Sequence, residues 1–250
     1  MKYSSKIAFA LVLCATIVTK CYENDKKKEV RKEVREKYLS GYYDNVMAKS
    51  TKIEIAKTDK FLPPESWNQY IVSNHFFISV PPTVELRNVD DVYTQEIKKI
   101  EWHGHKINED NVVFQQKGLS TNSENAHNTY CRIIINIQKG NSGDFMQCNE
   151  FEDLELEDIH FFQSLAIENS SGYEVIGTPS VRWVRIEDIY AIEVEYTRKG
   201  IDDNRTNVNS YYLFNDSILA NIILSYRQKD ANLWEKDFSN VIRTFTWNNK

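Results

Sequence analysis

The last third of the chain alternates between apolar and polar residues, which predicts a β-meander. From residue 190 to 197, every second position is tyrosine, isoleucine or valine, the period of a strand with one buried face. Tyr211–Phe214 is apolar at consecutive positions, so we expect a central strand covered on both faces. Alternation resumes from Ile218 to Tyr226 after the turn residues Asn215 and Asp216. These two strands are therefore predicted to form a β-hairpin.

Shorter patterns predict further strands in the first half of the chain. Ser73 and Asn74 separate two apolar runs, which should meet at a turn. Pro81 and Pro82 end the second run, because proline cannot donate to a sheet ladder. The predicted strands are 69–72, 76–80, 112–114 and a strand with Ile133, Ile135 and Ile137 on one face, closed by Gly140.

Two helices are predicted from apolar residues at three- and four-residue spacing. The first starts near Glu155 and Asp158, where carboxylates favour a helix N-terminus, and stops at Ser170. The second closes the chain, with Asn232 as its cap and Glu235 three residues later. A broad apolar face must pack on the sheet, and it consists of Leu233, Trp234, Phe238, Val241, Ile242 and Phe245.

The pattern predicts an α+β domain in which segregated helices pack on a mostly antiparallel sheet. The order of elements resembles the PsbP-like fold of a photosystem II extrinsic subunit and of a small Ran-binding nuclear-transport protein. That resemblance implies an α/β/α sandwich and a binding or assembly role. It is carried by Phe76–Pro82, Arg132–Lys139, Tyr190–Arg198, Tyr211–Arg227 and Trp234–Trp247.

The first twenty residues have the pattern of a secretory signal. Lys2 and Lys6 form a basic start, and Ile7–Val18 follows without a charge. That run is shorter than the roughly 20 residues that a membrane-spanning helix needs, so export is expected. The predicted organisation is a signal segment at 1–20, a charged tether and helix at 21–60, and a single globular domain at 61–250.

Cys21 lies where bacterial lipoprotein precursors, which the leader resembles, carry their lipid. Lys20 departs from that pattern, because a small residue is usual there. A membrane-anchored lipoprotein, ordinary secretion to the periplasm or medium, and an uncleaved anchor all stay open. Cys131 and Cys148 would then be free to form a disulfide in an oxidising compartment, or to remain two buried thiols.

Candidate chemistry is sparse. The net charge of −5, without a basic half, argues against nucleic acid. His103 and His105 would share a side of a strand, as two metal ligands can. No third ligand has a fixed spacing, so no metal and no cofactor is expected. Glu193 and Glu195 share a strand face, and we expect both to point to solvent.

The motifs of nucleophilic catalysis, phosphate binding and dinucleotide binding are missing from the sequence. The chain is therefore expected to be a non-catalytic, envelope-associated binding or assembly domain. Its partner would be an unknown protein or glycan, and the lipid would hold it at the membrane. The alternative is a secreted hydrolase or a metal-dependent enzyme of unrecognised type. Convergent histidines and carboxylates in a deep polar cleft would favour that alternative.

Overall fold

A computed structural model describes residues 56–87, 95–96, 105–107, 109–145, 154, 156–170, 172–200 and 203–248. The predicted signal segment, Cys21, His103 and Cys148 lie outside these residues. Within the described ranges, no helix is both long and apolar enough to cross a membrane.

The described residues form two sheets, and the larger has eight strands in the order β1-β9-β10-β11-β12-β8-β7-β4. Neighbouring strands are antiparallel except β1 and β9, which are parallel. β11 lies inside this sheet, and Tyr211–Phe214 is buried on both faces, as predicted. The strands are β1 (Ala56–Thr58), β4 (Val84–Leu86), β7 (Asn111–Gln116), β8 (Cys131–Lys139), β9 (Glu174–Ile186), β10 (Ile189–Lys199), β11 (Arg205–Asn215) and β12 (Ile218–Arg227).

The smaller sheet contains the hairpin predicted around Ser73 and Asn74. Both residues have positive φ, 47° and 59°, in the left-handed region that asparagine tolerates well in turns. The backbone N–H of His75 closes the turn on the carbonyl of Val72. The order is β13-β3-β2-β6-β5, with β2 (Asn68–Val72), β3 (Phe76–Val80), β5 (Gln95–Glu96), β6 (His105–Ile107) and β13 (Thr246–Trp247).

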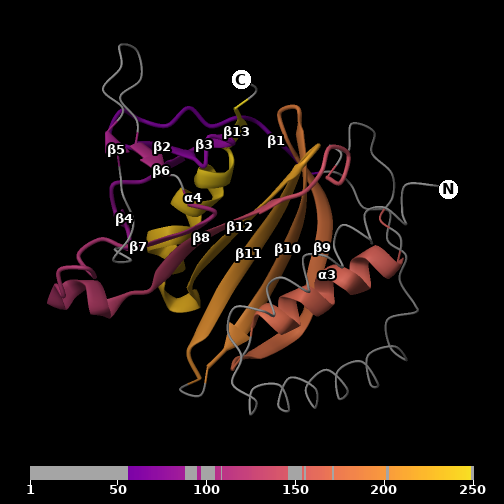
Figure 1. Ribbon diagram of the computed structural model, residues 1–250. Helices are drawn as coiled ribbons and strands as arrows, with labels where there is room; N and C mark the ends of the chain where they lie inside the picture. The colour runs from indigo at the N-terminus through magenta and orange to yellow at the C-terminus, as the bar shows by residue number, and fades with distance from the viewer. Residues whose placement is uncertain are drawn as a thin grey trace, which may run out of the picture.

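Among the described residues, two α-helices cover opposite faces of the large sheet (Figure 1). Helix α3 (Leu156–Asn169) packs on β9 and β10, and helix α4 (Ala231–Ile242) packs on β12 and on β3 of the small sheet. Two short 3₁₀ helices, η1 (Glu124–Asn128) and η2 (Gln228–Asp230), lie in connections. The predicted α+β class with a mostly antiparallel sheet between helices is therefore confirmed.

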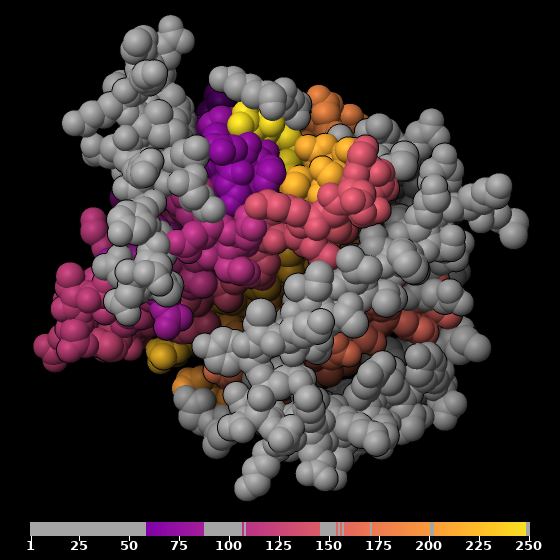
Figure 2. Space-filling model, in the orientation of Figure 1, coloured from indigo at the N-terminus to yellow at the C-terminus, as the bar shows by residue number. Residues whose placement is uncertain are grey.

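The core on the α4 side supports the main prediction for the closing helix. Phe238 is 1% exposed and meets Tyr226 of β12 edge-on, with ring centroids 5.9 Å apart. The space-filling view shows the purple residues of the first described segment, which ends at residue 87, next to the yellow C-terminal residues (Figure 2). Phe245 lies beyond the end of α4, and its ring packs on Phe76. The prediction for Leu233 is wrong, because it is 56% exposed: its position on α4 turns it away from both sheets.

The predicted cap of α4 is also wrong. The helix begins at Ala231, so Asn232 lies inside it and Asp230 holds the cap position without a side-chain cap hydrogen bond. The Asp230 carboxylate instead accepts from the Thr129 hydroxyl at 2.9 Å and the Tyr130 N–H at 3.2 Å. The Trp234 indole donates to the same Thr129 hydroxyl. Asp230 therefore ties the start of α4 to the segment before β8.

Strand β9 has no counterpart among the predicted elements. Gly177 (φ 72°) and Pro179 interrupt its alternation, and its register with β10 shifts between Glu195 and Thr197. A bulge adds a residue and breaks the two-residue period from which strands are recognised. Strand β1, inside the segment assigned to the tether, pairs with the end of β9. The sheet thus includes residues before the predicted domain start at 61.

Candidate binding site on the polar face of the large sheet

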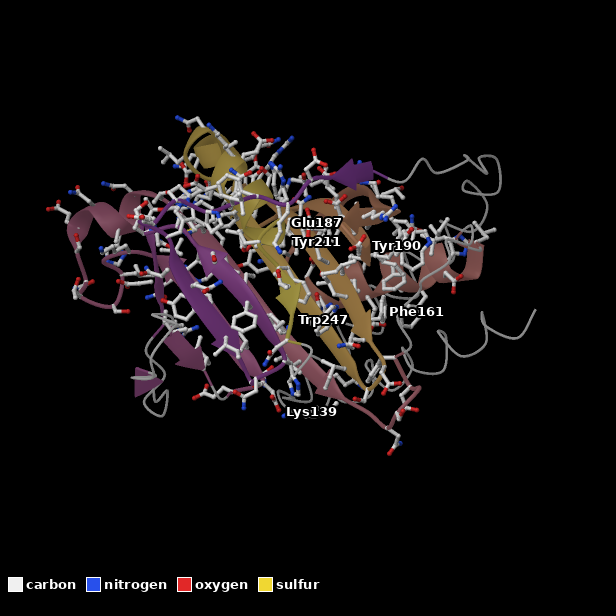
Figure 3. All side chains as sticks on the ribbon, turned by 90° about the horizontal axis from the view of Figure 1, so that it is seen from above. Lys139, Phe161, Glu187, Tyr190, Tyr211 and Trp247 are labelled. Atoms are coloured by element: carbon white, nitrogen blue, oxygen red, sulfur yellow. The ribbon has the colours of Figure 1, made fainter. Side chains whose placement is uncertain are left out.

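The sheet register brings polar residues of three neighbouring strands onto one side. Arg182 of β9 pairs with Glu193 of β10, which pairs with Tyr211 of β11. Tyr211 belongs to the core cluster under α4, so this is the α4 side of the sheet. Figure 3 shows Tyr190 and Phe161 near α3 and Tyr211 closer to the middle of the molecule. We define the polar face as Ser180, Arg182, Glu193, Glu195, Thr197, Asn207, Asn209 and Tyr211.

Glu193 is the centre of the polar face. Its side chain is 4% exposed and accepts hydrogen bonds from three donors. Arg182 Nε donates to Oε2 at 2.5 Å, while the Tyr211 hydroxyl at 2.6 Å and Asn209 Nδ2 at 3.3 Å donate to Oε1. Hydrogen bonds of this kind are what make a buried carboxylate tolerable. The arrangement therefore holds Arg182, Tyr211 and Asn209 in fixed positions.

Arg182 lies between the buried carboxylate and solvent. Its side chain is 43% exposed. Burial lowers the pKa of Arg182, but the hydrogen bond and charge of Glu193 outweigh it and raise the pKa above its ordinary value. Glu195 Oε2 is 4.0 Å from Nη2, and no hydrogen bond from the described residues reaches either Nη atom. The guanidinium is thus anchored through Nε on Glu193, with Nη2 beside Glu195, and the side chain stays 43% exposed.

Tyr211 stays a hydrogen-bond donor. Burial, followed by the charge and hydrogen bond of Glu193, raises its pKa well above the usual value. The hydroxyl therefore keeps its proton at neutral pH and spends it on Glu193. An acid–base catalyst needs a pKa near the working pH, and neither Tyr211 nor Arg182 has one. The polar face thus has the chemistry of a fixed hydrogen-bonding surface.

The polar face becomes more exposed away from Glu193. The side chain of Glu195 is 56% exposed, and Ser180 is exposed. Thr197 donates to Asn207 at 3.2 Å, and the side chains of both are half-buried. Hydroxyl, amide, carboxylate and guanidinium groups thus lie side by side at the surface.

The structure corrects one sequence prediction for this face and leaves the other in place. Glu193 does not point to solvent: Arg182, Asn209 and Tyr211 bury it between the neighbouring strands. Glu195, two residues along the same strand, is exposed as expected. Arg182 was missed because its strand was missed. A clue existed in the sequence, since an arginine and two glutamates at alternating positions can form cross-strand ion pairs.

The remaining predicted site residues do not converge in the described part of the chain. Only the backbone of His105 is described, as the first residue of β6. The described residues contain no group of three or more potential metal ligands. Cys131 opens β8 as predicted, and burial raises the pKa of its thiol to about 12. Because Cys148 is not described, their disulfide stays a prediction.

A second polar cluster lies where the β2–β3 turn meets β7 and β8. The Ser73 hydroxyl donates to Asp110 at 2.9 Å, and Lys139 forms an ion pair with Asp110 at 2.9 Å. Burial, then the charge of Lys139, lowers the pKa of His75. These contacts fasten the turn to the large sheet, and Figure 3 labels Lys139, which is the last residue of β8.

Comparisons with known proteins concern the fold alone. No family model and no curated protein matches the chain. CyanoP, the PsbP of the cyanobacterium Synechocystis sp. PCC 6803, is similar over 80% of this chain and 98% of its own, with 14% identity and a TM-score of 0.42. The resemblance to the PsbP-like fold is thus found again among solved structures.

Two further solved structures are similar. LpqN of Mycobacterium tuberculosis, described as involved in cell envelope biogenesis, is 9% identical with a TM-score of 0.33, over 69% of this chain and 82% of its own. A Bacteroides thetaiotaomicron VPI-5482 protein is 9% identical with a TM-score of 0.41, over 74% of this chain. The match spans 50% of that longer protein. At these scores the likeness carries no argument about function.

Proposed function

We propose that this protein is a non-catalytic, envelope-associated binding domain that recognises its partner through the polar face. The observation that carries the proposal is the Glu193 network. Three donors from two strands converge on one buried carboxylate, and the Arg182 side chain is left half-exposed. Groups held in place before binding lose little conformational entropy when a partner arrives.

Fixed geometry favours recognition over proton-transfer chemistry here. Glu193 already accepts from three donors, and the hydroxyl proton of Tyr211 is committed to it. A general base must also lie within hydrogen-bond reach of the substrate proton, and the Glu193 side chain is only 4% exposed. The exposed outer groups of the polar face, Ser180 and Glu195, lie at the surface within reach of a partner.

Envelope association rests on the leader. A basic start, a short apolar run and Cys21 support export followed by lipid attachment. Mass spectrometry of the mature protein should find the leader removed and a lipid mass on Cys21. An intact Met1 in the soluble cytoplasm would contradict export. A mature chain that begins elsewhere would contradict only the lipid anchor.

Binding through the polar face is tested with the full-length protein and envelope fragments that have been stripped of protein. Glu195→Lys reverses a charge next to Arg182, and we expect it to lower the fraction of protein that co-sediments with the fragments about tenfold. Glu65→Lys is the matched control, because it makes the same charge change at an exposed residue before β2. Equal co-sedimentation of the two variants would remove the polar face from the proposal.

A further inference from the structure

We propose that the ligand of the polar face is an uncharged carbohydrate chain, an inference that rests on the binding function proposed above. The first argument is the mixture of groups on the surface. Arg182 donates, Glu195 accepts, and the hydroxyls and amides around them do both. Sugar hydroxyls are also donors and acceptors at once, so each can be satisfied by such neighbours.

Charge selects for a neutral ligand. Glu193 offsets the positive charge of Arg182 from below, and Glu195 adds a negative charge 4.0 Å from Nη2. Polyanions such as nucleic acids or acidic glycans would meet a like charge at the point where they need a cation. A cationic ligand would meet the guanidinium instead. A neutral chain meets neither penalty.

The polar face lacks the features of a protein interface. Protein interfaces depend on large apolar or aromatic anchors at a centre depleted of charge. The exposed large hydrophobic residues of the described chain lie elsewhere, on α3, on α4 or in connections: Leu62, Leu156, Tyr173 and Leu233. The centre of the polar face is instead an ion pair with amide and hydroxyl neighbours.

The geometry of the sheet sets the width of the polar face, and the residues on that face set the expected affinity for a sugar chain. Three strands spaced about 4.8 Å apart give a surface roughly 10 Å wide, suited to a short stretch of a sugar chain. No aromatic ring of the described residues is exposed on this surface for a sugar to stack on. Binding therefore depends on hydrogen bonds alone, and we expect a Kd of about 0.1–1 mM.

The test uses the full-length protein and four neutral tetrasaccharides, of the chitin, cellulose, starch and mannan types, titrated to about 10 mM by NMR or calorimetry. Arg182→Lys keeps a charge beside Glu193 but loses the planar fork of donors. We expect about tenfold weaker binding in Arg182→Lys and in Glu195→Lys. Glu65→Lys should bind as the unaltered protein does. A thermal melt establishes that each variant is folded.

The outcomes separate this inference from the function on which it rests. No binding to any tetrasaccharide, or undiminished binding in both polar-face variants, would overturn the carbohydrate assignment. If no tetrasaccharide binds but protein-stripped envelope still retains the protein and Glu195→Lys lowers that retention, only the carbohydrate assignment is wrong. The binding function of the polar face then stands. Retention by intact envelope but not by stripped envelope would identify a protein partner and overturn the inference. Failure of both the sugar and the envelope experiments would overturn the two proposals together.

Discussion

The α4 side of the large sheet divides into two halves with the same alternation but opposite chemistry. Over β8 and β12, every second residue is apolar and belongs to the core shared with α4 and the small sheet, as with Ile133, Ile135, Ile222 and Leu224. Over β9 and β10, the same side is apolar at Val184, Ile186 and Ala191, but Arg182, Glu193 and Glu195 make the rest of it polar. Alternation therefore tells which side of a strand a residue occupies, and the neighbouring strands decide whether that side is covered.

Both halves contain buried positions, but they are stabilised differently. Phe238 in the covered half is held by ring contacts and by removal of apolar surface from water. Glu193 in the open half is held by directed hydrogen bonds, whose net contribution is smaller because water competes for the same groups. The covered half should thus contribute stability, while the open half should contribute a defined surface.

The largest effect is expected in the covered half. Phe238→Ala should lower the free energy of unfolding by about 3–5 kcal/mol, because it leaves a cavity between α4 and the sheet. Lys236→Ala, at an exposed position of the same helix, should change it by less than about 0.5 kcal/mol. Urea melts measure both variants. Equal stability of the two would mean that α4 does not dock through Phe238.

Removing the central carboxylate of the open half should cost less. Glu193→Ala leaves Arg182 without its partner, but the half-exposed guanidinium can regain water, so we expect a loss of about 1–3 kcal/mol. Glu195→Ala, at 56% side-chain exposure, should cost less than about 0.5 kcal/mol. A Glu193→Ala loss as large as that of Phe238→Ala would erase the contrast between the halves.

Glu85 lies outside both halves, on the edge strand β4 of the large sheet. Its carboxyl group makes the stability of the fold depend on pH in the acid range. Burial raises the pKa of Glu85, but hydrogen bonds from the Gly118 and Ser120 N–H groups and nearby side chains outweigh it and lower the pKa to about 2. A depressed pKa stabilises the fold above the unfolded value near 4.5, and this stabilisation is lost as the pH falls towards 2.

We expect that loss to be about 1 kcal/mol after screening by solvent. Glu85→Gln should remove this pH-dependent loss of stability, because the amide does not titrate. Urea melts of the unaltered protein and the variant, at pH 7 and near pH 2, measure the difference. An unchanged pH dependence in Glu85→Gln would show that another carboxylate is responsible.

The smallest change in stability is expected at Leu233, and it tests which residues of α4 belong to the covered half. Leu233 belongs to the same helix as Phe238 but is 56% exposed, so Leu233→Ser should change stability by less than about 0.5 kcal/mol. A loss of more than about 2 kcal/mol in a thermal or urea melt would place Leu233 in a core contact.

Local patterns predicted most elements correctly. The β11–β12 hairpin, the β2–β3 turn and strand β8 follow from alternation and turn residues that act over a few positions. The apolar face of α4 was correct at Phe238 and wrong at Leu233, because a stripe of helical spacing is wider than the surface that receives it. Asn232 and Asp230 are both residue types that cap helices well, and in the structure Asp230 holds the cap position while its carboxylate bonds Thr129.

The centre of the site could not be predicted from sequence alone. Glu193 and Glu195 lie on the same side of β10 and in the same alternating pattern, yet the side chain of Glu193 is buried and that of Glu195 is exposed. What distinguishes them is Arg182, on a strand whose bulge hides its alternation, and Tyr211, on the other neighbouring strand. Such a contact depends on register between strands, which no local pattern records.

The amino-acid sequence by itself determined the α+β class, the meander and the buried face of the closing helix, because hydrophobic periodicity is written into neighbouring residues. Only the tertiary structure decided that β9 lies beside β10, that α4 covers β12 and leaves the polar face open, and that Glu193 is buried. The physical reason is that burial of a charge requires partners on other strands, and only folding brings those partners within hydrogen-bond distance.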